Sequence, residues 1–86
     1  MPRFYFDVRE GASFTPDKEG VECESFDAAE RLAAESAAEI GRDRLPKGDA
    51  RDVTVELKNE HRQRILTVTV TMEIHRVDLE PLPPRT

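Results

Sequence analysis

The chain has 86 residues, of which 37% are hydrophobic and 36% are charged, and its formal net charge is -5. This size and composition predict one small acidic globular domain, which buries roughly 60 to 65% of the surface exposed by its unfolded chain. Such a domain leaves little room for a deep substrate cavity.

The acidic excess lies in the first third of the chain. Residues 1–30 hold 8 acidic and 3 basic side chains, so the totals of 18 and 13 leave 10 of each in residues 31–86. Phosphate backbones and anionic membranes attract clustered Lys and Arg, so we expect neither nucleic acid nor a membrane as a partner. No apolar run approaches the roughly 18 residues of a membrane span, and the N-terminus lacks the apolar region of a signal peptide. We therefore expect a cytoplasmic protein.

An alternating pattern near the start of the chain predicts a half-buried strand, with Phe4, Phe6 and Val8 on its apolar side. Glycine and proline turn signals follow this strand. A second short strand is predicted at residues 21–24, with a short extended piece before it at residues 14–15. The N-terminal part is therefore predicted to be a hairpin or a small meander with acidic loops.

An amphipathic helix of roughly 16 to 20 residues is predicted next, with Ser25 as its N-cap. Gly41 and Pro46 are expected to limit its end. Small and apolar residues recur along it at helical spacing: Ala29, Leu32, Ala33, Ser36, Ala37 and Ile40.

Two further alternating segments predict a C-terminal hairpin. The first places three apolar residues on one side, at Val53, Val55 and Leu57. The second spans residues 64–77 and places five there: Leu66, Val68, Val70, Met72 and Ile74. If Leu57 faces Leu66, one register buries both apolar sets together.

These elements predict an α+β fold in β-β-α-β-β order, in which an antiparallel sheet of three to four strands carries one amphipathic helix on one face. Residues 1–78 are expected to form a single domain. Residues 79–86 contain three prolines and are predicted to be a proline-rich C-terminal tail.

Four segments carry a resemblance to known sequences: the opening MPRFYFDV at residues 1–8, the acidic turn at 17–22, the helix start at 27–29, and residues 53–55. Through them the chain resembles a family of short alphaproteobacterial proteins of unknown function that open with Met-Pro-Arg followed by aromatic residues. The resemblance covers most of residues 1–75 and implies one α+β domain. It brings no catalytic residues and no cofactor.

Candidate chemical groups are few. Asp7, Glu73 and His75 are predicted on polar strand faces and would meet if the first and last strands were neighbours. We expect them to be solvated surface residues, and a catalytic or metal site is the alternative. The acidic stretch at residues 17–27 lacks the ligand spacing of a twelve-residue calcium loop, and Cys23 is predicted to be a small core residue.

No catalytic, cofactor-binding or metal-binding residue is therefore assigned, and we expect no cofactor. The favoured function is a small non-catalytic protein-interaction or regulatory module. The alternative is a small-molecule or metal-dependent activity that uses polar residues on the open sheet face.

An interaction surface is predicted on the uncovered sheet face, at Tyr5, Thr67, Thr69 and Thr71. The predicted strand at residues 64–77 outruns its neighbour, which leaves backbone groups unpaired along one edge. We expect that edge to pair either with a second copy of the chain, giving a homodimer, or with the N-terminal strand of the same copy.

Overall fold

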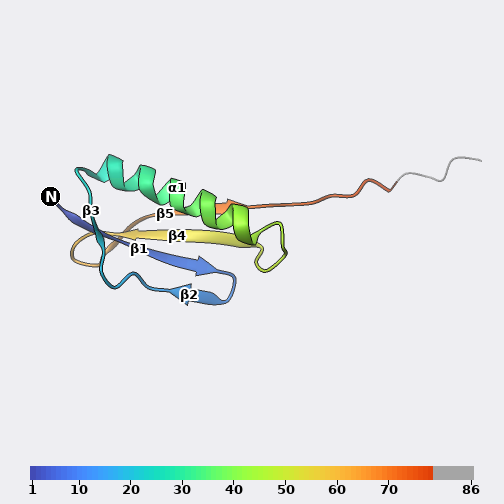
Figure 1. The fold of residues 1–86 in the computed structure, drawn as a ribbon, viewed down its shortest axis with the longest axis horizontal. Coiled ribbons are helices and arrows are strands. Elements are labelled where there is room, and N and C mark those ends of the chain that lie inside the picture. The colour runs from blue at the N-terminus through green and yellow to red at the C-terminus, as the bar shows by residue number, and fades with distance from the viewer. Residues whose placement is uncertain (79–86) are drawn as a thin grey trace, which may run out of the picture.

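The chain folds into one helix and an antiparallel sheet of five strands, in the order β-β-β-α-β-β, in a computed structural model that describes residues 1–78 (Figure 1). The elements are β1 (Arg3–Glu10), β2 (Ser13–Thr15), β3 (Val21–Glu22), α1 (Phe26–Arg44), β4 (Asp52–Lys58) and β5 (Arg64–Thr71). The predicted α+β class is confirmed. The sheet has five strands where three to four were predicted, because the extended piece before the second predicted strand is a strand of its own, β2. The proline-rich tail predicted at residues 79–86 lies outside the described residues.

The sheet has the order β2-β1-β4-β5, and β3 pairs with the N-terminal end of β1. The predicted register of the last hairpin is confirmed, since Leu57 faces Leu66 and Val55 faces Val68. The alternative pairing of the N-terminal strand with β5 is wrong, because β1 lies beside β4 with Phe6 facing Leu57.

β5 is shorter than the predicted strand at residues 64–77. It ends at Thr71 because its partner β4 begins at Asp52, which faces Thr71. Residues 72–78 continue beyond the sheet without a ladder partner, as the orange segment after β5 shows (Figure 1). The extent of β5 is thus determined by β4.

The helix begins at the predicted cap, where the Ser25 hydroxyl oxygen accepts from the Ala28 N–H at 3.1 Å. Its length of 19 residues agrees with the prediction, but it runs past Gly41 to Arg44. Gly41 is a packing residue, because a Cβ there would lie 3.1 Å from Val70 Cγ1. The missing side chain lets the helix approach β5.

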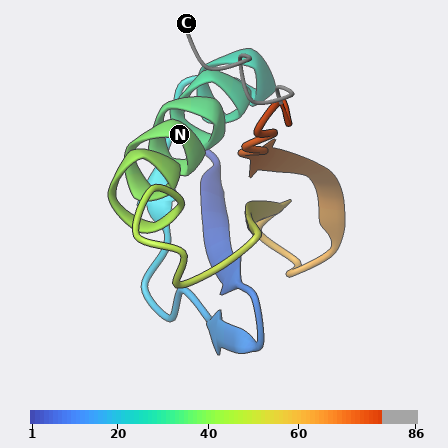
Figure 2. The ribbon, with the colours of Figure 1, turned by 90° about the vertical axis from the view of Figure 1, so that its right-hand side faces the viewer.

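The core lies between α1 and one face of the sheet (Figure 2). A row of alanines on the helix has no exposed surface: Ala29, Ala33 and Ala37. Because alanine is small, the helix axis lies close to the sheet, and the apolar row of β4 beneath it is also fully buried. Among the described residues, no helix has both the length and the apolar character needed to cross a membrane.

Candidate functional site

The sheet face opposite α1 carries the polar side chains of the three longest strands. Alternation along the strands places them there, because residues opposite each other in a ladder share a face. From β1 come Tyr5, Asp7 and Arg9, from β4 Thr54, Glu56 and Lys58, and from β5 Thr67, Thr69 and Thr71. This open face is the candidate functional site.

Two carboxylates occupy the middle of this face. Asp7 and Glu56 stand directly opposite each other, and only 2% and 7% of their surfaces are exposed. Like charges in that arrangement repel, so each needs its own cation. Lys58 Nζ donates to Asp7 Oδ2, while Arg9 Nε lies 3.3 Å and Arg64 Nη1 3.8 Å from the Glu56 carboxylate.

Asp7 is held in its ionised form. Burial alone would raise its pKa, but the hydrogen bond from Lys58, the N–H of Asp17 at 2.8 Å and the nearby charges outweigh burial. The pKa of Asp7 therefore lies below its ordinary value of 3.8. A carboxylate so fully occupied by donors is a weak proton acceptor, which makes it a structural anion rather than a general base.

Asp17 fills a gap in the sheet. β2 and β3 pair with opposite ends of β1, and between them the Phe6 N–H donates to Asp17 Oδ2 at 3.1 Å. Asp17 Oδ1 accepts from the N–H groups of Glu19 and Gly20 at 3.2 and 3.0 Å. The side chain thus replaces a missing strand partner and shapes the turn that follows.

The loop at residues 16–20 is locked against β1 from both sides. Gly20 has φ +77°, and a Cβ there would lie 2.9 Å from atoms of Phe4 and Tyr5. The Arg62 guanidinium lies 4.0 Å above the Tyr5 ring and donates to the carbonyl oxygens of Asp17 and Lys18 at 3.5 Å. Tyr5, predicted as part of an open contact surface, is therefore half-buried under Arg62.

The three threonines of β5 are exposed, at the other side of the open face. Thr69 shares a hydrogen bond of 2.8 Å between hydroxyl oxygens with Thr54. Among residues 1–78, β5 pairs with β4 alone, so its outer edge has no ladder partner. The predicted interaction residues of β5 therefore lie along an unpaired edge.

The ladder pattern determines which backbone groups point outward at that edge. The Phe6 N–H points toward Asp17 and thus away from β4. Two residues that face each other in an antiparallel ladder direct their backbone groups either both toward or both away from each other. Leu57 faces Phe6 and therefore directs its backbone groups away from β1, toward β5. Leu66 faces Leu57 and points inward. Backbone direction alternates from one residue to the next along a strand, so the groups of β5 that point outward after Leu66 belong to Thr67, Thr69 and Thr71.

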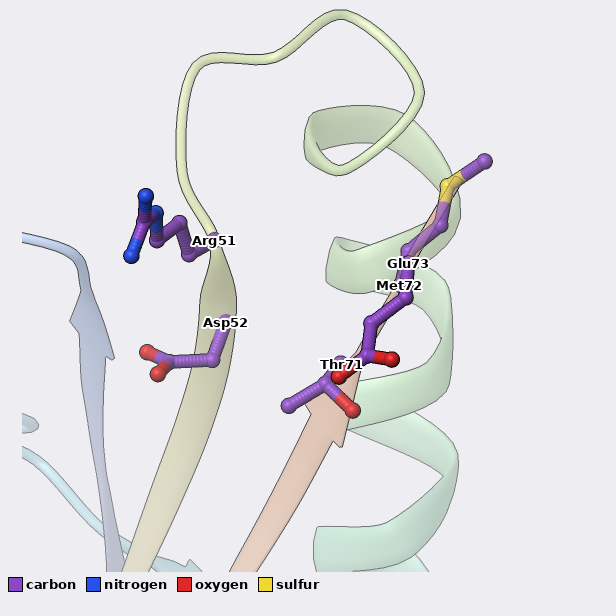
Figure 3. A pocket seen from close by; sticks show the side chains of 5 residues that line it. All are labelled: Arg51, Asp52, Thr71, Met72 and Glu73. Atoms are coloured by element: carbon purple, nitrogen blue, oxygen red, sulfur yellow. The ribbon is translucent and has the colours of Figure 1, made fainter. Parts of the chain in front are cut away.

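A pocket of about 270 Å³ lies where β4 begins and β5 ends (Figure 3). Its lining consists of Arg51, Asp52, Thr71, Met72 and Glu73. The side chains come from two neighbouring strand ends, and all but Asp52 are exposed. Ligand pockets are typically larger, roughly 300 to 1,000 Å³, and mostly apolar, so this hollow is typical of the solvent-facing end of a sheet.

The hypothetical site of Asp7, Glu73 and His75 does not assemble. Glu73 and His75 are exposed beyond the end of β5, where their side chains contact each other at 3.0 Å. Asp7 is level with Glu56, four residues along β4 from the position that faces Thr71, a separation of roughly 13 Å along the sheet. Within residues 1–78, no group of three or more His, Cys, Asp or Glu is placed to hold a metal ion.

Cys23 is buried, as predicted, and burial raises the pKa of its thiol. The roles of Asp17 and Arg62 were not predicted. An Asp followed three residues later by Gly is a turn signal that points to Asp17. Arg62 offers no such signal, because it reaches Asp17 and Tyr5 only after the chain has folded.

Comparison with known proteins gives a family and no activity. No curated protein and no solved structure matches the chain. One family model matches residues 3–71, from the first residue of β1 to the last of β5. The matched part thus contains the whole sheet, the helix and the open face, and the chain belongs to the family described as a domain of unknown function (DUF6894).

Proposed function

We propose that the chain is a small non-catalytic protein-interaction module that binds a partner by adding a strand to the outer edge of β5. The observation that carries the proposal is the character of that edge. Lysine, proline and inward-pointing charged residues normally block an exposed edge. Residues 65–71 include no Lys, no Pro and no other charged residue. Main-chain pairing along such an edge provides affinity, and side chains on alternate positions provide specificity.

The open face provides further contact groups beside the outer edge of β5. Its carboxylates are occupied by the cations around them, so the threonines of β5 are the exposed groups that remain available to a partner. Threonine is uncharged and β-branched, which suits it to a sheet that continues into another strand.

The setting we propose is the bacterial cytoplasm, as in the alphaproteobacterial proteins that the opening residues resemble. The acidic balance of the chain supports a protein partner over nucleic acid or a membrane. The competing activity, with polar side chains acting on a small molecule or metal, has little support because Asp7 lies far from Glu73 and His75.

The test is capture of partners by variants of a single edge residue. Thr67→Pro removes an N–H that points outward, so the ladder between β4 and β5 is preserved. Thr67→Val retains that N–H and serves as the matched control. We expect the tagged wild-type chain and Thr67→Val to retain the same partner from the native cytoplasm, and Thr67→Pro to lose it. Circular dichroism checks that both variants are folded. Equal capture by all three chains would refute binding through this edge.

A further inference from the structure

The apolar row of β5 is incompletely covered. On β4 the corresponding side chains have no exposed surface: Val53, Val55 and Leu57. On β5 they are only half-buried: Leu66, Val68 and Val70. The helix thus covers β4 fully and reaches β5 only in part, which leaves apolar surface beside the unpaired edge.

The apolar alternation also continues beyond the end of the sheet. Met72 and Ile74 follow Val70 at the same two-residue spacing, and they are 44% and 76% exposed. Both belong to residues 72–78, the segment that runs on from β5 without a ladder partner (Figure 1). A row of apolar side chains in strand spacing is the pattern of one face of a paired strand.

We propose that a second copy of this chain covers this surface, with the two β5 strands paired antiparallel about a twofold axis at Thr69. The inference rests on the proposed function, since it uses the same edge. In this register Thr67 of one copy faces Thr71 of the other, and Thr69 faces its own counterpart. All the outward-pointing threonine backbone groups are then paired.

The same register covers Met72, the nearer of the two overhanging apolar residues, whereas Ile74 stands opposite Arg64 of the second copy. Met72 stands opposite Leu66 of the second copy, on the face that carries the helix, so two partly exposed apolar side chains bury each other. Because the axis is twofold, the contact is made twice. Shifting the axis by one residue to Val68 places Met72 opposite Arg64, which loses the apolar contact. Shifting it to Val70 places Thr67 opposite Glu73, so only the axis at Thr69 pairs the three threonines with one another.

Charges at both ends of the pairing are complementary. Glu73 stands opposite Ile65 of the second copy and beside its Arg64. The bulge between β4 and β5 turns Arg64 onto the open face, where Glu73 also lies. The Arg64 and Glu73 side chains are 62% and 76% exposed in the single chain, where Arg64 lies 3.8 Å from Glu56 and Glu73 contacts His75 at 3.0 Å, so solvent can reach both charges and they can also contact a second copy. A second copy thus supplies the apolar, main-chain and charge partners together.

The first test is the mass of the purified chain in sedimentation equilibrium. We expect the mass of the wild type to rise from 9.8 kDa to twice that value as concentration increases into the high micromolar range. Thr69→Lys places like charges at the axis and is expected to keep the chain at the single mass. Thr54→Lys is the matched control, because it removes the same hydroxyl contact and adds the same charge to the same face, one strand inward. It is expected to leave the doubled mass.

The second test is the register, examined in a Cys23→Ser background with a short thiol-to-thiol cross-linker. Thr69→Cys is expected to cross-link to its own counterpart. Thr67→Cys and Thr71→Cys are expected to cross-link efficiently only when the two chains are mixed. Cross-linking by Thr67→Cys alone would overturn the axis at Thr69.

The outcomes distinguish this inference from the proposed function. A wild-type mass of 9.8 kDa throughout, or a doubled mass in Thr69→Lys, overturns the second copy as the occupant of the edge. Neither result depends on the capture experiment with Thr67→Pro, whose failure refutes the edge as a binding site for other proteins.

Discussion

Replacing Asp7 by Asn tests whether the buried Asp7 carboxylate on the open face stabilises the folded chain. The Asp7 side chain is 3% exposed and that of Lys58 is 25% exposed, so little water can solvate the Lys58 ammonium group once the Asp7 charge is removed. A hydrogen bond to a charged group contributes about 1.5 to 3 kcal/mol. The variant also relieves repulsion with Glu56 directly opposite, which offsets up to about 1 kcal/mol. We expect the free energy of unfolding to fall by about 0.5 to 3 kcal/mol at pH 7, measured by urea denaturation followed by circular dichroism.

The pH dependence gives this prediction its sign. Because the pKa of Asp7 is lower in the folded chain than its ordinary 3.8, the unfolded chain binds the proton first as pH falls. The stability contributed by Asp7 is therefore fully present above about pH 3.8 and is lost as pH falls through the folded pKa. The difference between wild type and Asp7→Asn should shrink at pH 3.

Glu22→Gln is the control for Asp7→Asn. The Arg3–Glu22 pair is separated by 3.3 Å, but the two side chains are 43% and 54% exposed. We expect a loss of about 0.5 kcal/mol or less. Equal losses for the two variants, or a loss for Asp7→Asn that is the same at pH 3 and pH 7, would refute the assignment of Asp7 as a stabilising buried anion.

The remaining predictions concern backbone and burial. Gly20→Ala should destabilise the chain more than Gly48→Ala in thermal melts. Both glycines have φ +77° and share a backbone cost of about 1 to 2 kcal/mol, but only at Gly20 would a Cβ contact β1. Equal losses would contradict the close approach of the loop at residues 16–20 to β1. Ser25→Ala should reduce the free energy of unfolding by about 1 kcal/mol, with Ser25→Asp close to wild type, and an unchanged value for the alanine variant would argue against the cap. Cys23, buried and with a raised pKa, should react with a thiol reagent at a rate that increases with urea, and fast labelling of the folded chain would show that its burial is incomplete.

Alternation in the sequence was sufficient to predict the two sheet faces and the register of the last hairpin. A slip of one residue between Leu57 and Leu66 would have exposed every apolar side chain on both strands, so one solution was strongly favoured. The Ser25 cap followed from equally local chemistry. The end of β5 did not, because it depends on where β4 begins.

The burial of Asp7 had no local signal. Alternation assigned it to the polar face but does not reveal what covers that face. The covering loop at residues 16–20 reaches Asp7 through the Asp17 N–H, and Lys58 arrives from β4, about fifty residues along the chain. Charge pairing across such separations depends on the order of strands, which the sequence left open. For the same reason, the cations that neutralise Asp7 could not be identified from the sequence.

The two edges of the sheet are treated differently, and this contrast argues for function at β5. On one side, the edge of β1 is closed by β2 and β3, which have only three and two residues, with Asp17 accepting the Phe6 N–H between them. Short edge strands and side chains that occupy backbone groups are the means by which proteins prevent unwanted pairing. On the other side, within residues 1–78, the eight residues of β5 have no partner along their outer edge and no blocking residue after Arg64. Because every part of the β1 edge is closed, including the single Phe6 N–H between β2 and β3, while the β5 edge stays open along a β-branched strand, this contrast supports the proposal that the β5 edge pairs with another strand.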